Sequence, residues 1–277
     1  MERSYDLTGK VIWITGSSRG IGNGVARYLA EQGAHIVMHG TTATSIRSFH
    51  EGNSLQQAAD EISAEHGVEV TAVAGDLTDP DTVHRIAEEI RLRHQKVDVL
   101  INCAGGDIGA RGVSGPLAGK PESNDAVFIS LEDLSVVLAR NLMTCIYCCR
   151  EIAPGMMERK SGRIINVGSI AAMKGMESSV VYSTAKAGVH QYSRCLAVQL
   201  RPYNVTVNVV APGDIVTPRW KASREYDESK MVEDGTLDRY GRVVEVARLM
   251  GFLASDASGY VTGQVIRIDG GMQCWPG

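Results

Sequence analysis

The sequence of 277 residues predicts a single α/β domain in which about seven parallel strands form a doubly wound sheet flanked by helices. Short apolar runs rich in β-branched residues alternate with segments long enough for crossover helices. Most of these runs lack strict apolar/polar alternation, as expected for strands covered on both faces. No repeat or linker divides the chain, so one domain is expected over residues 1–277.

Each element has its own local signal. The apolar runs predict strands at 11–15, 35–40, 68–74, 97–102, 163–168, 204–210 and 264–268. The segments between them predict helices near 20–32, 54–66, 80–94, 131–159, 179–201 and 242–254. Three connections, 41–53, 106–130 and 214–241, are longer than a minimal link. Loops after parallel strands surround the ligand crevice, so 106–130 and 214–241 are the expected substrate loops.

Composition and charge exclude several classes of protein. The formal charge of −4 and the pI near 6.0 give no attraction to nucleic acid or to an anionic membrane. The N-terminus has no apolar signal region, and no stretch approaches the length of a membrane span. Six scattered cysteines form no disulfide framework, which fits the cytoplasm. The Cys145–Cys148 CxxC has no second Cys or His pair nearby and predicts buried apolar thiols, so no metal site is expected.

A glycine-rich turn follows the first predicted strand. The stretch "TGSSRGIG" places Gly16, Gly20 and Gly22 between that strand and the first helix. Glycines allow a tight turn and a close approach of the backbone to a pyrophosphate, whose charge the helix N-terminus favours. An ordinary strand-turn-helix connection is the alternative, but the position favours a dinucleotide site.

The end of the second strand bears on cofactor choice. NAD-binding chains usually carry an Asp or Glu there to hold the ribose hydroxyls. This strand ends in His39, Gly40 and Thr41, and the first carboxylate comes at Glu51. Because a 2′-phosphate would not be repelled and Arg19 offers a positive partner, the sequence favours NADP(H). NAD(H) stays open, since Arg19 can equally be a solvated turn residue.

Tyr182 and Lys186 stand four residues apart, on one face of a predicted helix. A fixed cation close to a phenol favours the ionised form and would bring an acid/base tyrosine nearer neutral pH. The same spacing recurs at Tyr226 and Lys230, in a charged stretch that is typical of a solvated surface. Context therefore favours the first pair.

Several motifs in order make the chain resemble the short-chain dehydrogenase/reductase family over nearly its whole length. They are "TGSSRGIG", Asp76 with Leu77, "NCAG" for the family's NNAG, Asn141, Ser169, the Tyr182–Lys186 pair, "PGDIVT" and the terminal "DGG". Cys103 departs from NNAG and is interpreted as a tolerated small residue. Ser169 precedes Tyr182 by 13 residues, the family's usual interval, whereas Gly213 stands at that offset from Tyr226.

The resemblance implies a catalytic tetrad of Asn141, Ser169, Tyr182 and Lys186. In that scheme Tyr182 is the general acid/base, while Lys186 lowers the phenol's pKa and bonds the nicotinamide ribose. Ser169 polarises the substrate oxygen, and Asn141 orders a water next to Lys186. The implied cofactor-binding residues are Gly16, Ser18, Arg19, Gly20, Ile21, Gly22, Gly40, Thr41, Asp76, Leu77, Asn102, Ala104, Gly105, Tyr182, Lys186, Pro212, Gly213, Ile215 and Thr217.

These inferences predict an NADP(H)-dependent oxidoreductase that acts on a ketone or secondary alcohol. "HGTTATS" and "YSTAKAG" look like the 3-oxoacyl-(acyl carrier protein) reductases, but segment 106–130 is longer than in those enzymes. A specialised alcohol, polyol or cyclic-substrate dehydrogenase is therefore an equal contender. An NAD(H)-dependent alcohol or polyol dehydrogenase is the alternative to the NADP(H)-dependent enzyme. A dinucleotide-binding regulator without turnover is the third hypothesis. Family members are usually tetramers, so the resemblance also implies a homotetramer.

One basic cluster has two interpretations. Arg219, Lys221 and Arg224 would suit an acidic phosphopantetheine carrier. Their acidic neighbours favour a solvated lid instead.

Overall fold

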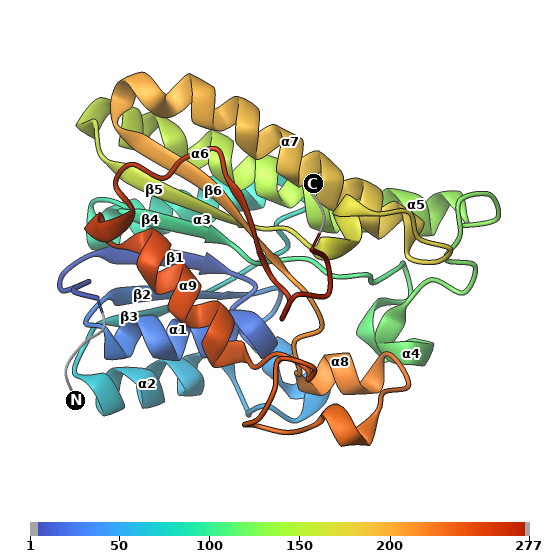
Figure 1. Cartoon of the computed structure of the whole chain (residues 1–277). Helices are drawn as coiled ribbons and strands as arrows, with labels where there is room; N and C mark the ends of the chain where they lie inside the picture. Colours follow the sequence, from blue (N-terminus) through green and yellow to red (C-terminus); the bar gives the residue numbers. More distant parts are fainter. Residues whose placement is uncertain (1–4, 275–277) are drawn as a thin grey trace.

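Within residues 5–274, which the computed structural model describes, seven parallel strands form one sheet in the order β3-β2-β1-β4-β5-β6-β7 (Figure 1). The strands are β1 (Val11–Thr15), β2 (His35–Gly40), β3 (Val70–Ala74), β4 (Val99–Asn102), β5 (Gly162–Val167), β6 (Val205–Pro212) and β7 (Val265–Ile268). The order reverses between β1 and β4, and a crevice beyond the carboxyl ends of the strands is expected at such a point.

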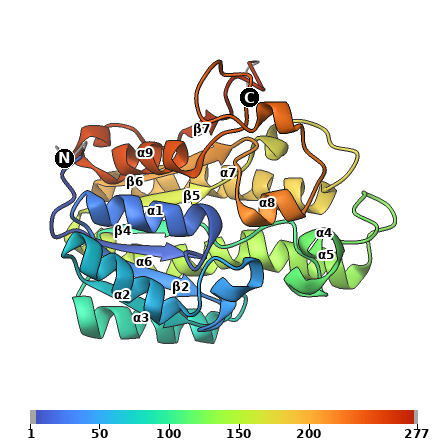
Figure 2. The same cartoon turned by 90° about the horizontal axis from the view of Figure 1, so that it is seen from below.

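Helices cover both faces of the sheet. One face carries α1 (Gly20–Glu31), α2 (Leu55–His66) and α9 (Val243–Ala254). The other carries α3 (Pro80–His94), α6 (Thr144–Arg159) and α7 (Val180–Leu200). The short helices α4 (Pro116–Gly119) and α8 (Pro218–Ala222) lie with α5 (Leu131–Leu138) at one end of the molecule, as Figure 2 shows. That end is where the strands point, so these elements border the crevice.

The two hydrophobic cores explain the apolar strands. In β1, Ile12 and Ile14 pack among residues of α1, α2 and α9, while Val11 and Trp13 pack among residues of α3, α6 and α7. Successive side chains of a strand point to opposite faces, so a strand covered on both faces is apolar at each position. The predicted doubly wound single domain is confirmed.

The segment 131–159 differs from the single helix that the sequence predicts. A π-helical turn at Ala139–Met143 separates α5 from α6. Within it, the Asn141 amide donates to the carbonyl of Val137 at 2.8 Å and to that of Gly106 at 2.9 Å. The Asn141 amide thus takes the place of a main-chain donor at the i−4 carbonyl, an insertion that distorts a helix, and π-bulges are frequent at functional sites.

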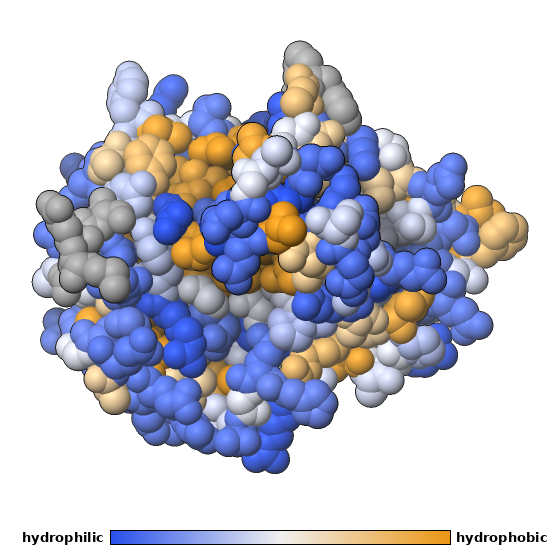
Figure 3. All heavy atoms as spheres, turned by 60° about the horizontal axis from the view of Figure 1, so that its bottom comes forward, coloured by the Kyte–Doolittle hydropathy of each residue, from blue (hydrophilic) through white to orange (hydrophobic). Residues whose placement is uncertain are grey.

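The connection 106–130 is irregular. Leu117 and Ala118 in α4 have left-handed backbone angles, with φ of 49° and 54°. Val127 and Phe128 are exposed in the loop before α5, which forms the apolar projection at the right edge of Figure 3. In the described part of the chain, no helix is both long and apolar enough to cross a membrane.

Candidate active site

The glycine turn between β1 and α1 is built so that side chains are excluded. Gly16 has a φ of +66°, and a Cβ there would lie 2.7 Å from the Cα of Ala104. A Cβ on Gly22 would lie 2.5 Å from the carbonyl oxygen of Gly16. Both obstacles are backbone atoms that cannot move aside. The first turn of α1 therefore stays open to a ligand that approaches its main-chain N–H groups.

His39 supports this turn from beneath. The Gly16 N–H donates to His39 Nδ1 at 3.1 Å, and His39 Nε2 lies 3.0 Å from the carbonyl oxygen of Gly75. Nδ1 must therefore lack a proton and Nε2 must carry one. Burial lowers the pKa of His39 to about 4, so the ring is neutral at physiological pH.

This arrangement makes stability depend on pH. Between about pH 6.5 and pH 4 the unfolded state binds a proton on His39 that the folded state does not, so stability falls as the pH drops through this window. Because of His39, we expect the free energy of unfolding to be about 2 kcal/mol lower at about pH 5 than at pH 7. Denaturant unfolding of wild type and His39→Asn at both pH values measures this, because Asn can still accept the Gly16 bond but does not titrate. An equal pH dependence of the two proteins would contradict the assignment.

A small cavity of about 100 Å³ lies beside the turn, at the ends of β2 and β3. Nine of the predicted cofactor residues line it: Gly16, Ser18, Arg19, Gly40, Thr41, Asp76, Leu77, Ala104 and Gly105. Arg140, which the sequence reasoning missed, lines the same cavity as Arg19. Arg19 Nη1 donates to the carbonyl of Ser45 at 3.2 Å, and its guanidinium lies 5.1 Å from the centre of the Phe49 ring. Two cations therefore face this end of the cleft.

Glu51 was also missed. Segment 41–53 folds back so that Glu51 Oε2 accepts a hydrogen bond from the Gly20 N–H at 2.7 Å, in the first turn of α1. Burial raises the pKa of Glu51, and the Gly20 bond and the charge of Arg19 oppose this. The lack of a carboxylate at the end of β2 therefore does not keep negative charge away from the glycine turn.

A larger cavity of about 490 Å³ continues from the turn to α7. The predicted residues that line it are Gly16, Arg19, Gly20, Ile21, Gly22, Gly105, Ser169, Tyr182, Lys186, Pro212, Gly213, Ile215 and Thr217. Tyr182 and Lys186 lie one turn apart on α7, and Ser169 follows β5. The structure thus brings a phenol, an ammonium and a hydroxyl from two sequence motifs to one cavity.

The pKa of Tyr182 is shifted in the direction opposite to the expected one. Lys186 Nζ donates to the carbonyl of Val167 at 2.8 Å and lies 5.8 Å from the centre of the Tyr182 ring. Burial raises the pKa of Tyr182, while a hydrogen bond with Ser169 lowers it. Burial also lowers the pKa of Lys186. For Tyr182, desolvation therefore outweighs the hydrogen bond with Ser169. The lowering of this pKa by Lys186 stays a prediction.

Two predicted residues lie behind the cavity rather than on its wall. Asn141 is 1% exposed, and its Oδ1 accepts from the Gly106 N–H at 2.8 Å. Asn102 is 5% exposed and donates to Asn166 Oδ1 at 2.8 Å. Asn141 fixes the chain that follows β4, whereas Asn102 ties β4 to β5.

The remaining motifs fall outside the cleft. Tyr226 packs against Trp220, with ring centres 5.4 Å apart, and Lys230 pairs with Asp238 at 2.5 Å, so neither faces the larger cavity. Cys145, Cys148 and Cys149 are buried and free, and burial raises the pKa of the Cys148 thiol.

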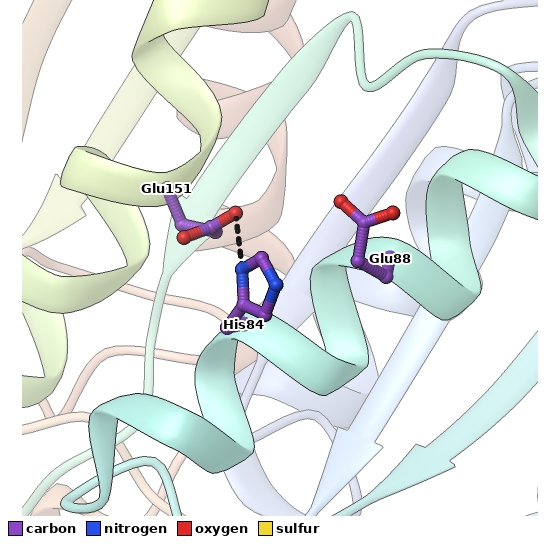
Figure 4. Close-up of side chains that lie close together, drawn as sticks. All are labelled: His84, Glu88 and Glu151. Carbon is purple, nitrogen blue, oxygen red and sulfur yellow. Dashed lines mark hydrogen bonds and ion pairs between the residues drawn. The ribbon is translucent and has the colours of Figure 1, made fainter.

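Among residues 5–274, one group of side chains that could hold a metal ion lies on α3 and α6. His84, Glu88 and Glu151 offer atoms within 4.8 Å of one another, and His84 Nδ1 lies 3.2 Å from Glu151 (Figure 4). The Arg91 guanidinium already bonds both carboxylates. These charges are thus compensated within the protein.

The parallel sheet with a glycine turn at its first crossover defines a Rossmann-type dinucleotide-binding protein. Residues 16–273 match a family model described as enoyl-(acyl carrier protein) reductase. Cyclohexanol dehydrogenase of Rhodococcus sp. (strain TK6) is 34% identical, over 98% of this chain and 99% of that protein. The 3-oxoacyl-[acyl-carrier-protein] reductase FabG of Aquifex aeolicus is also 34% identical, over 96% and 98%.

A solved structure, 7α-hydroxysteroid dehydrogenase complexed with NADH and 7-oxo glycochenodeoxycholic acid, superposes with a TM-score of 0.82 at 27% identity, over 98% of each chain. The protein belongs to the short-chain dehydrogenase/reductase family and is an oxidoreductase.

Proposed function

We propose that the protein is an NADP(H)-dependent oxidoreductase that interconverts a ketone and a secondary alcohol, with Tyr182 as the general acid/base. The observation that carries this proposal is the cavity that runs from the glycine turn to Tyr182, Ser169 and Lys186. A dinucleotide fits the turn because Gly16 and Gly22 leave room where a Cβ would collide with backbone. When bound, the nicotinamide supplies or accepts the hydride.

The side chains have distinct tasks in this proposal. Tyr182 gives its phenolic proton to the carbonyl oxygen during reduction and takes it back during oxidation. Ser169 hydrogen-bonds the same oxygen and holds it within reach of the phenol. Lys186 is buried at the floor of the cavity, where its ammonium can bond the ribose of the cofactor. Asn141 exchanges two hydrogen bonds with the main chain of Gly106, so its role in this proposal is to position the chain that follows β4.

Preference for NADP(H) is supported by the small cavity. Arg19 and Arg140 line it together with Thr41, whereas Glu51 lines only the larger cavity. A 2′-phosphate placed there would meet two guanidinium groups and a hydroxyl. An NAD(H)-dependent alcohol dehydrogenase is the second candidate, because a relative is named cyclohexanol dehydrogenase and a structural neighbour was solved with NADH. The cytoplasmic location and the homotetramer stay predictions.

A carbonyl panel tested with both cofactors, followed at the nicotinamide absorbance, examines the proposal. We expect at least one ketone to be reduced, with a higher kcat/KM for NADPH than for NADH. Equal or better efficiency with NADH would overturn the cofactor preference. Dinucleotide binding without oxidation across the panel would favour the regulator.

Glu51→Gln is expected to tighten the binding of NADPH about tenfold. The carboxylate bonds the Gly20 N–H in the helix turn that the pyrophosphate needs, and a neutral amide competes less strongly for that donor. Isothermal titration calorimetry measures the change. Glu65→Gln is the matched control, because Glu65 lies on the exposed face of α2, outside both cavities. Weaker binding in Glu51→Gln would show instead that Glu51 holds the cofactor.

A further inference from the structure

The far end of the larger cavity is walled by charged side chains from the two long loops. Segment 106–130 contributes Asp107 and Lys120, and segment 214–241 contributes Asp214, Arg219 and Arg224. The two loops are joined there, since Arg219 Nη2 donates to the carbonyl of Asp107 at 2.7 Å. The same cavity holds Tyr182 and Ser169, so these charges face whatever binds beside the phenol.

The cations of this wall are only partly neutralised. Arg224 pairs with Asp214 at 2.6 Å, and Asp214 also accepts from Trp220 Nε1 at 3.0 Å. Arg219 bonds only main-chain carbonyls, those of Asp107 and Ala118, and its Nε is buried without a partner. Within residues 5–274 the Lys120 ammonium has neither a hydrogen bond nor an ion pair.

The other carboxylate of the wall, that of Asp107, already accepts hydrogen bonds from neighbouring side chains. Asp107 is 6% exposed, and its Oδ2 accepts from Asn124 at 2.7 Å and from Ser179 at 2.8 Å. Its Oδ1 is buried and has no partner, which leaves an acceptor for a donor such as a hydroxyl. Asp107 therefore does not form an ion pair with Lys120 or Arg219.

Leaving two half-buried cations unpaired is costly, and the pKa directions agree with the geometry. Burial lowers the pKa of Lys120, and the neighbouring charges of Arg224 and Arg219 lower it further, against Asp107 and Asp214. Burial also lowers the pKa of Arg219, which the Tyr182 phenol opposes. A negatively charged ligand next to these two cations would lower the electrostatic cost of burying them.

We propose that the substrate is a ketone or secondary alcohol that carries a carboxylate, and that Lys120 and Arg219 bind this carboxylate while Tyr182 faces the reacting carbon. The inference rests on the proposed function and names the substrate class of the same site. The part of the wall that the two loops form has three cations and two carboxylates, so it leaves one positive charge, and the exposed Lys174 lies on another part of the cavity lining. That balance suits a single negative charge better than a dianionic phosphate.

The position of Lys221 separates this site from the basic cluster of the sequence. Lys221 is exposed on α8 and does not line the cavity, whereas Arg219 and Arg224 do. Two of the three basic residues therefore face the substrate end of the cavity, and Lys221 does not.

Equilibrium binding to the protein saturated with NADP⁺ tests the proposal without turnover. The probes are 4-oxocyclohexanecarboxylate and its neutral methyl ester, measured by calorimetry. We expect the acid to bind about tenfold more tightly than the ester. Lys120→Met should abolish this ratio, and Lys221→Met, which removes the same charge outside the cavity, should keep it.

Each other outcome counts against the inference. Equal affinity of acid and ester in wild type would overturn it, as would equal effects of Lys120→Met and Lys221→Met. Displacement of the acid by inorganic phosphate at lower concentration than by acetate would overturn the choice of a carboxylate. Tight binding of the acid with no ketone reduced by NADPH or NADH would instead contradict the proposed function, and would leave the carboxylate site in place.

Discussion

Tyr182→Phe is expected to lower kcat for ketone reduction by at least about a hundredfold, the lower range for loss of a positioned acid. The substitution removes only the hydroxyl, so the ring still packs against Ile129, Val137 and Val181. Because burial raises the pKa of Tyr182, the phenol is protonated at neutral pH, the form that reduction needs. Steady-state rates with the best ketone of the panel, together with a thermal unfolding curve, measure the effect.

Tyr226→Phe is the matched control, since Tyr226 has the same spacing to Lys230 and lies outside both cavities. Its ring would keep its contact with Trp220. We expect its rate to stay within about twofold of wild type. A Tyr182→Phe protein that is folded and as fast as Tyr226→Phe would show that another group transfers the proton.

Gly16→Ala is expected to weaken NADPH binding by at least about a hundredfold and to destabilise the fold by several kcal/mol. Its Cβ would lie 2.7 Å from the Cα and 2.9 Å from the nitrogen of Ala104, and the φ of +66° is unfavourable for alanine. The turn and the chain after β4 would have to separate at the centre of the cofactor cleft. Calorimetric titration with NADPH and denaturant unfolding measure both effects.

Gly9→Ala separates backbone strain from collision. Gly9 has a φ of +72°, and a Cβ there meets nothing within 4 Å. We expect this variant to lose about 1–2 kcal/mol of stability and no affinity for NADPH. Similar affinities in Gly16→Ala and Gly9→Ala would show that the close approach to Ala104 does not shape the cofactor site.

Much of the fold could be predicted because local patterns determine it. A strand such as β1 is buried on both faces, so Val11–Thr15 appears in the sequence as an uninterrupted apolar run with the observed bounds. Segment 131–159 was predicted less well. Its π-turn depends on a bond between Asn141 and Gly106, 35 residues apart, and helical periodicity carries no information about such a contact.

Some residues of the candidate site could be predicted from local patterns, and others could not. The glycine turn and the spacing of Ser169, Tyr182 and Lys186 are local, and the structure brings these groups to one cavity. Glu51 and Lys120 could not be predicted, because irregular loops carry them into the cleft by tertiary contacts alone. Their only signal was the length of the connections 41–53 and 106–130.

Transfer of deuterium tests the central claim most directly. The protein is incubated with NADPH deuterated at the transferable C4 position and a ketone of the panel, and the product alcohol is analysed by mass spectrometry and NMR. The account predicts one deuterium on the carbinol carbon in each product molecule. Bound dinucleotide with no deuterated alcohol under any condition would contradict it, and would leave a protein that holds its cofactor without using it.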